Sequence, residues 1–88
     1  MDDYTFSDNK AGQRYELLKD GALAAHADYR LQDGAVVLTH TEVLPGSEGR
    51  GIGSKLAKLV LDDLRHRGAK VVAQCDFMAK YIARHPQG

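Results

Sequence analysis

The sequence predicts a mixed α/β fold with an α+β mixed sheet, in which an antiparallel β-meander is followed by a β-α-β unit and a short C-terminal helix. Three observations predict this fold. Apolar and polar residues alternate through the first half between Asp-Gly turns, the spacing becomes helical after residue 51, and a short apolar run follows that helix. Because the chain has 88 residues, we expect one domain over residues 1–88.

The first half is typical of consecutive hairpins. Residues 1–12 have no clear period and are expected to be disordered or to form an edge strand around 4–6. Residues 13–19 and 22–31 are strand candidates joined by Asp-Gly, a strong hairpin signal. The alternation in the second candidate places a set of apolar residues on one face and a set of polar residues on the other: Leu23, Ala25, Ala27, Tyr29 and Leu31, against His26, Asp28 and Arg30.

A second Asp-Gly, at 33–34, leads into residues 35–43, whose β-branched composition predicts a central strand. From Ile52 the apolar residues keep helical spacing as far as Leu64, with Asp63 as an exception on the apolar side. Gly68 stands where such a helix would stop.

Residues 69–75 read as a short buried strand, and residues 77–85 read as a short helix that ends before Pro86. We expect Phe77 to pack this second helix onto the sheet. The strand at 35–43, the helix at 52–66 and the strand at 69–75 make a β-α-β unit.

The two strands of that unit should be parallel, joined by a right-handed crossover. Their carboxyl ends then lie at the same edge of the sheet, with the start of the helix. This placement brings residues 40–43, Cys75 and the loop EGRGIGSKL at 48–56 together. Ligands of open α/β sheets usually bind beyond the carboxyl ends of the strands.

The glycines of EGRGIGSKL have two readings. They give a phosphate close access to the unpaired N–H groups and the positive dipole at a helix N-terminus, or they only supply positive φ angles at a turn. Two nucleotide-binding patterns are excluded. The Walker order GK[ST] fails at Ser54-Lys55, and the GxGxxG fingerprint fails because Leu56 stands at its third glycine.

Together the motifs resemble a known family. GRGIGSKL ahead of an amphipathic helix is similar to the pyrophosphate loop of the GNAT acetyltransferase superfamily. HTEV at 40–43, EGRGIGSKL at 48–56, C-x-F at 75–77 and YIARHP at 81–86 resemble, in this order, the minimal single-domain GNAT-like family. The resemblance covers roughly residues 13–86 and implies the minimal GNAT fold.

The resemblance implies that the protein binds acetyl-CoA. Pantetheine would pair with the backbone of the first parallel strand near Glu42 and Val43. The pyrophosphate would be held by backbone N–H groups of the loop, which are those of Arg50, Gly51, Ile52, Gly53 and Ser54.

Two positions depart from the family pattern. Glu48 replaces the usual Gln or Arg, and we expect its carboxylate to face solvent or to accept a nearby N–H. Asp76 replaces the proline of the minimal family and adds a negative charge beside Cys75.

Three side chains are candidates for the chemistry. Histidine titrates near neutral pH, so His40 is a candidate base, or else an inert residue on a face that it shares with Val36 and Leu38. Cys75 is a candidate nucleophile or a thiol lining the pantetheine slot, and otherwise a small apolar filler. Tyr81 lies where many GNAT proteins carry a tyrosine that protonates the leaving thiolate, or is an ordinary helix residue.

The expected function is therefore acetyl-CoA-dependent N-acetyl transfer to a primary amine, such as a protein lysine, an N-terminus or a small polyamine. The alternative is a non-catalytic acyl-CoA-binding or interaction module on the same fold, favoured by Asp76 beside Cys75. The acceptor could be a protein or peptide, because no N-terminal helical lid is expected over its site.

Composition and charge argue against several classes of protein. The formal net charge is zero, which argues against nucleic-acid binding, although the first 44 residues have eight acidic and four basic residues and the rest have the reverse. No apolar run approaches the length of a membrane span, and the N-terminus lacks a signal-peptide pattern. A single cysteine excludes an internal disulfide and favours the cytoplasm. We expect no metal and a monomer.

Overall fold

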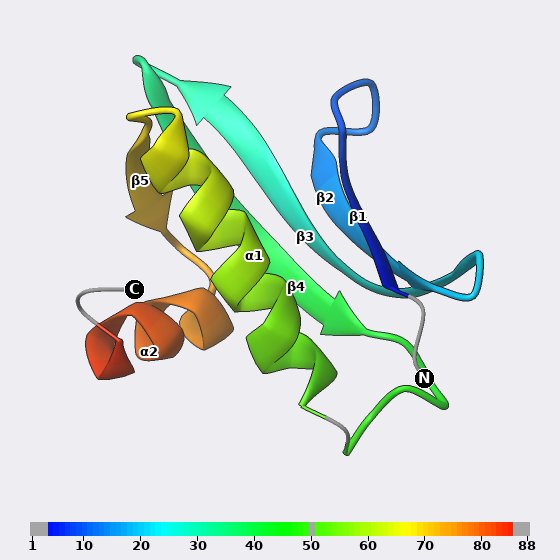
Figure 1. The fold of residues 1–88 in the computed structure, drawn as a ribbon. Helices are drawn as coiled ribbons and strands as arrows, with labels where there is room; N and C mark the ends of the chain where they lie inside the picture. The colour runs from blue at the N-terminus through cyan, green and yellow to red at the C-terminus, as the bar shows by residue number, and fades with distance from the viewer. Residues whose placement is uncertain (1–3, 50, 86–88) are drawn as a thin grey trace.

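The computed structural model describes residues 4–49 and 51–85, which form one five-stranded sheet and two helices (Figure 1). The strands and helices, in chain order, are β1 (Tyr4–Asn9), β2 (Arg14–Lys19), β3 (Ala22–Gln32), β4 (Ala35–Val43), α1 (Ile52–His66), β5 (Lys70–Ala73) and α2 (Asp76–Arg84).

The sheet has the predicted mixed topology. Its spatial order is β1-β2-β3-β4-β5, with antiparallel neighbours up to β4 and a parallel β4–β5 pair. Both Asp-Gly dipeptides form the predicted two-residue turns. Asp20 and Gly21 have φ angles of 52° and 84°, and Asp33 and Gly34 have φ angles of 52° and 78°, as a type I′ turn requires at both central positions.

Helix α1 covers one face of the sheet, and α2 lies beside it at the end of β5 (Figure 1). The buried side chains of α1 meet those of β2, β3 and β4 in one core, to which α2 contributes Met78. The helix ends just before Gly68, as predicted; Gly68 has φ +69°, and its N–H bonds to the carbonyl of Arg65 at 2.9 Å.

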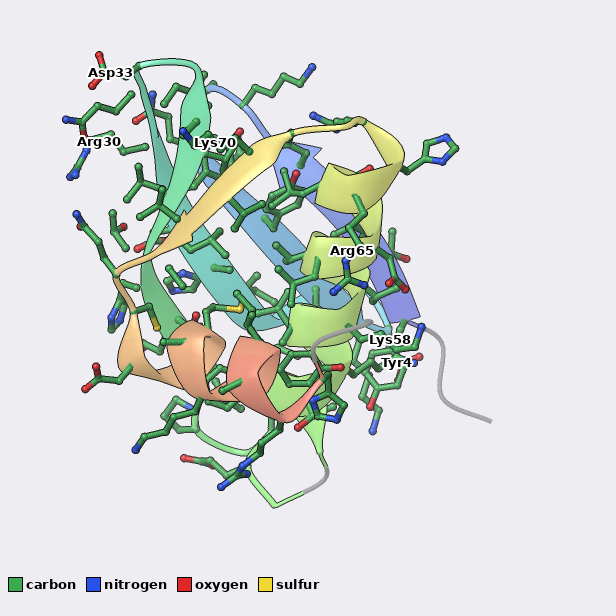
Figure 2. The ribbon with its side chains drawn as sticks, turned by 90° about the vertical axis from the view of Figure 1, so that its left-hand side faces the viewer. Tyr4, Arg30, Asp33, Lys58, Arg65 and Lys70 are labelled. Atoms are coloured by element: carbon green, nitrogen blue, oxygen red, sulfur yellow. The ribbon has the colours of Figure 1, made fainter. Side chains whose placement is uncertain are left out.

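None of the described helices covers the opposite face of the sheet. In Figure 2, Arg30 and Asp33 project to this side, whereas Arg65 and Lys58 project from α1 on the other side. We call the uncovered side the open face. No helix among the residues described is long and apolar enough to cross a membrane.

Several sequence-based expectations need correction. The strand predicted at 69–75 ends at Ala73, because the chain turns out of the sheet at Gln74 to enter α2. Leu31 lies on the expected face but is 65% exposed, since β3 extends past the apolar surface of α1. Residues 4–9 form an edge strand, as one of the two expectations stated.

Candidate functional site

The two parallel strands separate at their carboxyl ends. The last residue pair is Leu38 with Ala73, yet β4 continues to Val43. The N–H groups of Gln74 and Cys75 both bond to the carbonyl of Leu38, at 2.9 and 3.0 Å, so the chain leaves β4 at this point. Residues 39–43 of β4 therefore do not pair with β5, and we call this edge of β4 the strand opening.

A β-bulge in β4 decides which side chains border the strand opening on each face. Leu38 pairs with Tyr29 and His40 pairs with Asp28, so Thr39 is an extra residue. Leu38 is fully buried under the helices, whereas the His40 side chain is 58% exposed on the open face. The expectation that His40 shares a face with Val36 and Leu38 is wrong, because the bulge reverses the alternation.

Cys75 lies at the helix side of the strand opening. It is half-buried, immediately precedes α2, and its Sγ lies 3.3 Å from Thr41 Oγ1. Thr41 pairs with the buried residue Ala27, which places it on the face opposite His40. His40 and Cys75 are thus brought to the same edge of the sheet but face opposite sides of it.

The pairing of β3 with β4 also fixes the direction in which the backbone N–H and C=O groups of β4 point at the strand opening. The N–H of Leu44 bonds to the carbonyl of Ala24 at 2.9 Å, so residue 44 directs its polar groups toward β3. Backbone groups alternate in direction along an antiparallel strand. Those of Glu42 therefore face β3, and those of Thr41 and Val43 face the strand opening.

The predicted anion loop lies at the start of α1. Gly49 and Gly51 have φ angles of 80° and 69°, and a Cβ built at either position would meet no atom within 4 Å. Gly51 is the N-cap, no side chain caps this end, and the first turn carries no acidic residue. The first N–H groups of α1 thus remain available to an anion.

Gly53 has a different role from its two neighbours in the loop. A Cβ on Gly53 would lie 2.9 Å from Cζ of Phe77, which is closer than carbon atoms can pack. Gly53 therefore lets the Phe77 ring rest on the first turn of α1. Phe77 was expected to pack α2 onto the sheet; its ring is 39% exposed and lies against α1, where it lines a cavity of about 280 Å³ with Val43, Ile52 and the loop.

Glu48 does what the sequence analysis expected. Its Oε1 accepts the N–H of Gly46 at 2.9 Å, so the carboxylate is occupied within the loop. Asp76 starts α2, where a negative charge is favourable at the helix N-terminus. Arg50 lies outside the described residues.

Tyr81 lines a second hollow, of about 120 Å³, that adjoins the first through Ser54 and Phe77. Its ring stacks on that of His85 with centroids 4.2 Å apart. Lys80 and Arg84 complete the lining and give this hollow a basic character. The two hollows together follow the N-terminal end of α1 from Val43 to α2. Phe77 lines both hollows, although the sequence pattern did not place it at a site.

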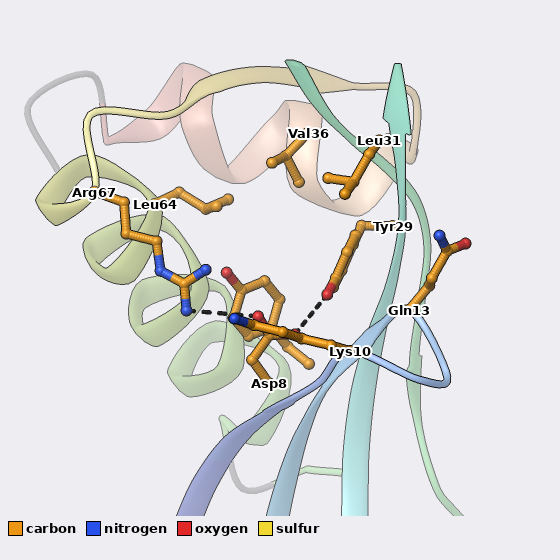
Figure 3. A pocket seen from close by; sticks show the side chains of 9 residues that line it. Asp8, Lys10, Gln13, Tyr29, Leu31, Val36, Leu64 and Arg67 are labelled. Atoms are coloured by element: carbon orange, nitrogen blue, oxygen red, sulfur yellow. Dashed lines mark hydrogen bonds and ion pairs between the residues drawn. The ribbon is translucent and has the colours of Figure 1, made fainter. Parts of the chain in front are cut away.

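A third cavity, of about 240 Å³, lies at the other end of α1 (Figure 3). Its charged groups pair with one another: Tyr29 donates to Asp8 at 2.6 Å, and Arg67 lies 3.5 Å from the same carboxylate. Burial, then the hydrogen bond to Asp8, raises the pKa of Tyr29 to about 12. The side chains of Tyr29, Asp8 and Arg67 thus satisfy one another, and Lys10 and Gln13 also line this cavity.

No group of three or more His, Cys, Asp or Glu side chains in the described part of the chain is arranged to hold a metal ion.

Comparison with known proteins gives one family. A profile of the family described as GCN5-related N-acetyl-transferase matches residues 14–88, which is most of the chain. No curated protein sequence matches. The match spans the separated parallel strands, the glycine loop and both helices. The chain therefore belongs to the GCN5-related N-acetyltransferase family.

Proposed function

We propose that the protein is an acetyl-CoA-dependent N-acetyltransferase that acylates a primary amine. One observation carries the proposal. Beside the strand opening, the uncapped N-terminus of α1 lies on one side of the sheet and His40, a candidate base, lies on the other.

The helix side of the strand opening fits acetyl-CoA. The N–H groups of Gly51 to Ser54 suit a pyrophosphate, with Arg50 as a predicted further contact. The backbone groups of Thr41 and Val43 suit the amides of pantetheine, whereas those of Glu42, which was also predicted to pair with pantetheine, face β3. When bound, acetyl-CoA supplies a thioester whose carbonyl carbon an amine can attack.

His40 is suited to take a proton from the acceptor. Its Nε2 lies 3.3 Å from Oε1 of Glu42. A carboxylate only accepts hydrogen bonds, so Nε2 carries the proton and Nδ1 keeps a lone pair. This arrangement orients the ring and leaves Nδ1 free to act as a base.

We propose that Tyr81 and Cys75 act near the sulfur atom of CoA. Tyr81 lies in the hollow next to the loop, where a phenol can return a proton to a leaving thiolate. Cys75 keeps two proposed roles, as a nucleophile or as a wall of the pantetheine slot. We further propose a monomer that works in a reducing compartment such as the cytoplasm, on an amine carried by a protein, a peptide or a small polyamine.

The test has two stages. Acetyl-CoA should raise the melting temperature of the wild-type protein, because a ligand that binds only the folded state stabilises it. Release of free CoA should then depend on added amine. Thermal stabilisation without amine-dependent CoA release would support the alternative, a non-catalytic acyl-CoA-binding module, and no stabilisation would contradict both.

Two variants separate direct from covalent transfer. Direct transfer predicts that His40→Ala loses at least about a hundredfold in rate, the usual contribution of an acid–base group. It also predicts that Cys75→Ala keeps most of the activity. An acetyl adduct on Cys75 in mass spectra after rapid mixing would instead favour the covalent route.

A further inference from the structure

We propose that the acceptor amine is recognised in its charged form by Asp28 and Glu42, which hold it against His40 on the open face of the sheet. This inference rests on the proposed function and adds the residues that select the acceptor. With His26, these side chains form a His–carboxylate quartet on β3 and β4.

In the quartet, each imidazole has a carboxylate as its neighbour both along its own strand and across to the other strand. Along β3, His26 Nδ1 lies 2.8 Å from Asp28 Oδ1, and along β4, His40 Nε2 lies 3.3 Å from Glu42 Oε1. The register sets His26 opposite Glu42 and Asp28 opposite His40. Each imidazole thus has one carboxylate beside it and another across from it, and the two rings are 6.3 Å apart.

The bulge at Thr39 is what assembles the quartet. Without the extra residue, His40 would follow Leu38 onto the helix side and would be separated from Asp28. With it, His40 and Glu42 join His26 and Asp28 on the open face, directly beside the strand opening.

The charges of the quartet favour a cation. With both imidazoles neutral, Asp28 and Glu42 contribute two negative charges. The nearest neighbours on β2 do not cancel them, because Arg14 Nε already bonds to Glu16 Oε2 at 2.8 Å. Hydrogen bonds from Asn9 and Arg14 lower the pKa of Glu16, as expected for a fully engaged carboxylate.

The exposure of the four side chains suits the binding of an ammonium group by Asp28 and Glu42. The Asp28 and Glu42 side chains are accessible to a ligand, whereas only 11% of the His26 side chain is exposed. The Nδ1–H of His26 faces Asp28, since a carboxylate cannot donate. His26 is therefore a positioning residue that fixes Asp28, and Asp28 and Glu42 are the groups that contact the ammonium.

The ammonium nitrogen loses two protons on becoming an amide, and the quartet takes the first of them; the second leaves the nitrogen after its attack on the thioester and ends on the departing thiolate, so that CoA leaves as a thiol. The two carboxylates bind the substrate ammonium, and one of its protons moves to Nδ1 of His40. The amine nitrogen then has its lone pair, and the imidazolium is stabilised by Glu42. The neutral amine is formed next to the strand opening, where the acyl donor is expected from the other side.

The kinetic test compares a charged and a neutral nucleophile. At pH 7.5 propylamine is an ammonium ion, whereas hydroxylamine is mostly neutral. We expect Asp28→Asn and Glu42→Gln each to raise the KM for propylamine roughly tenfold or more, the loss typical of one hydrogen bond to a charged group. The KM for hydroxylamine should stay unchanged in Asp28→Asn after subtraction of the uncatalysed reaction, whereas Glu42→Gln is read from the KM for propylamine alone, because Glu42 also orients His40.

Asp33→Asn is the matched control. It removes the same charge from the same hairpin, at the turn far from the strand opening, and Asn tolerates the positive φ of 52° at this position. It should change neither KM. Equal losses for both nucleophiles in Asp28→Asn, or an Asp33→Asn effect as large as the others, would overturn the proposal.

A binding measurement keeps this inference separate from the proposed function. In ¹⁵N amide spectra of the wild type, propylammonium should shift the signals of Asp28 and Glu42, and propanol of matched size should not. Such shifts in a protein that releases no CoA would support the ammonium site while refuting the transferase. Absence of the shifts would overturn the site.

Discussion

Gly53 is a residue at which helix propensity and side-chain packing act in opposite directions. Alanine is more favourable than glycine inside a helix by about 1 kcal/mol. Its Cβ, however, would lie 2.9 Å from Cζ of Phe77, so the ring must swing away. We expect Gly53→Ala to change the free energy of unfolding by less than about 1 kcal/mol. It should weaken acetyl-CoA binding several-fold in calorimetric titration, because the displaced ring enters the cavity.

The control for this prediction is the same substitution beside a smaller side chain. In a Phe77→Leu background the added methyl group has no ring to displace, so Gly53→Ala should produce no further loss of affinity. An equal loss in both backgrounds would mean that Gly53 matters through its own contact with the ligand.

Several residue roles were predictable and others were not. Glycines ahead of a helix predicted the open loop. Because Glu48 stands where the family usually has Gln or Arg, its carboxylate was expected to face solvent or to accept a nearby N–H, and it does accept the N–H of Gly46. The contact between Gly53 and Phe77 joins residues on different helices, which no local pattern reveals. The bulge at Thr39 was equally hidden, since TH inside a β-branched run continues the strand pattern without interruption.

At the scale of the elements, a network of two tyrosines, two carboxylates and Arg67 joins the sheet to α1. Tyr15 on β2 donates to Asp63 of α1 at 2.8 Å, and Tyr29 on β3 donates to Asp8 of β1 at 2.6 Å. Arg67, just past α1, lies 3.1 Å from Asp63 and 3.5 Å from Asp8. Asp63 interrupts the apolar stripe of the helix because it accepts this tyrosine, a partner that the sequence pattern could not identify.

This network predicts a loss of stability in alkali. Burial, then the hydrogen bond to Asp63, raises the pKa of Tyr15 well above its ordinary value of 10.0, and the pKa of Tyr29 rises to about 12. Above pH 10 the unfolded chain releases these protons while the folded chain keeps them, so the free energy of unfolding falls as the pH rises. Denaturant unfolding between pH 9 and about 12 should show this decline.

The decline should depend on the buried hydroxyls. Tyr29→Phe should make the free energy of unfolding less steep with pH between 10.0 and about 12. Tyr4→Phe is the matched control, since the Tyr4 ring meets Lys55 Nζ at 5.0 Å on the surface of α1. A pH dependence unaltered by Tyr29→Phe would show that this hydroxyl ionises as freely in the folded chain as in the unfolded one.

At the scale of the whole molecule, most of the fold could be predicted from the periodicity of apolar residues and from the turn residues. The switch from alternation to helical spacing defined the β-α-β unit, and the crossover rule made its strands parallel. That inference placed the glycine loop, His40 and Cys75 at one sheet edge, as the structure does. The face that each side chain occupies depends on the bulge and on the early end of β5. These features arise from pairing between strands, so the sequence pattern did not reveal them.

The proposed function places acetyl-CoA and the acceptor amine on different sides of the sheet. Acetyl-CoA is expected on the helix side and the amine on the open face, with the strand opening between them. The cavity at the far end of α1 lies apart from this proposed site, and Tyr29, Asp8 and Arg67 bind one another within it.

The most direct test of the central claim is a ¹⁵N amide titration of the wild-type protein with acetyl-CoA. If acetyl-CoA binds at the strand opening and the glycine loop, the largest shifts should occur at Thr41 and Val43 and at the start of α1, from Gly51 to Ser54. Lys10 and Gln13, at the cavity at the far end of α1, should stay unchanged. Shifts centred on those two residues, or no shift at the start of α1 at saturating acetyl-CoA, would contradict the account.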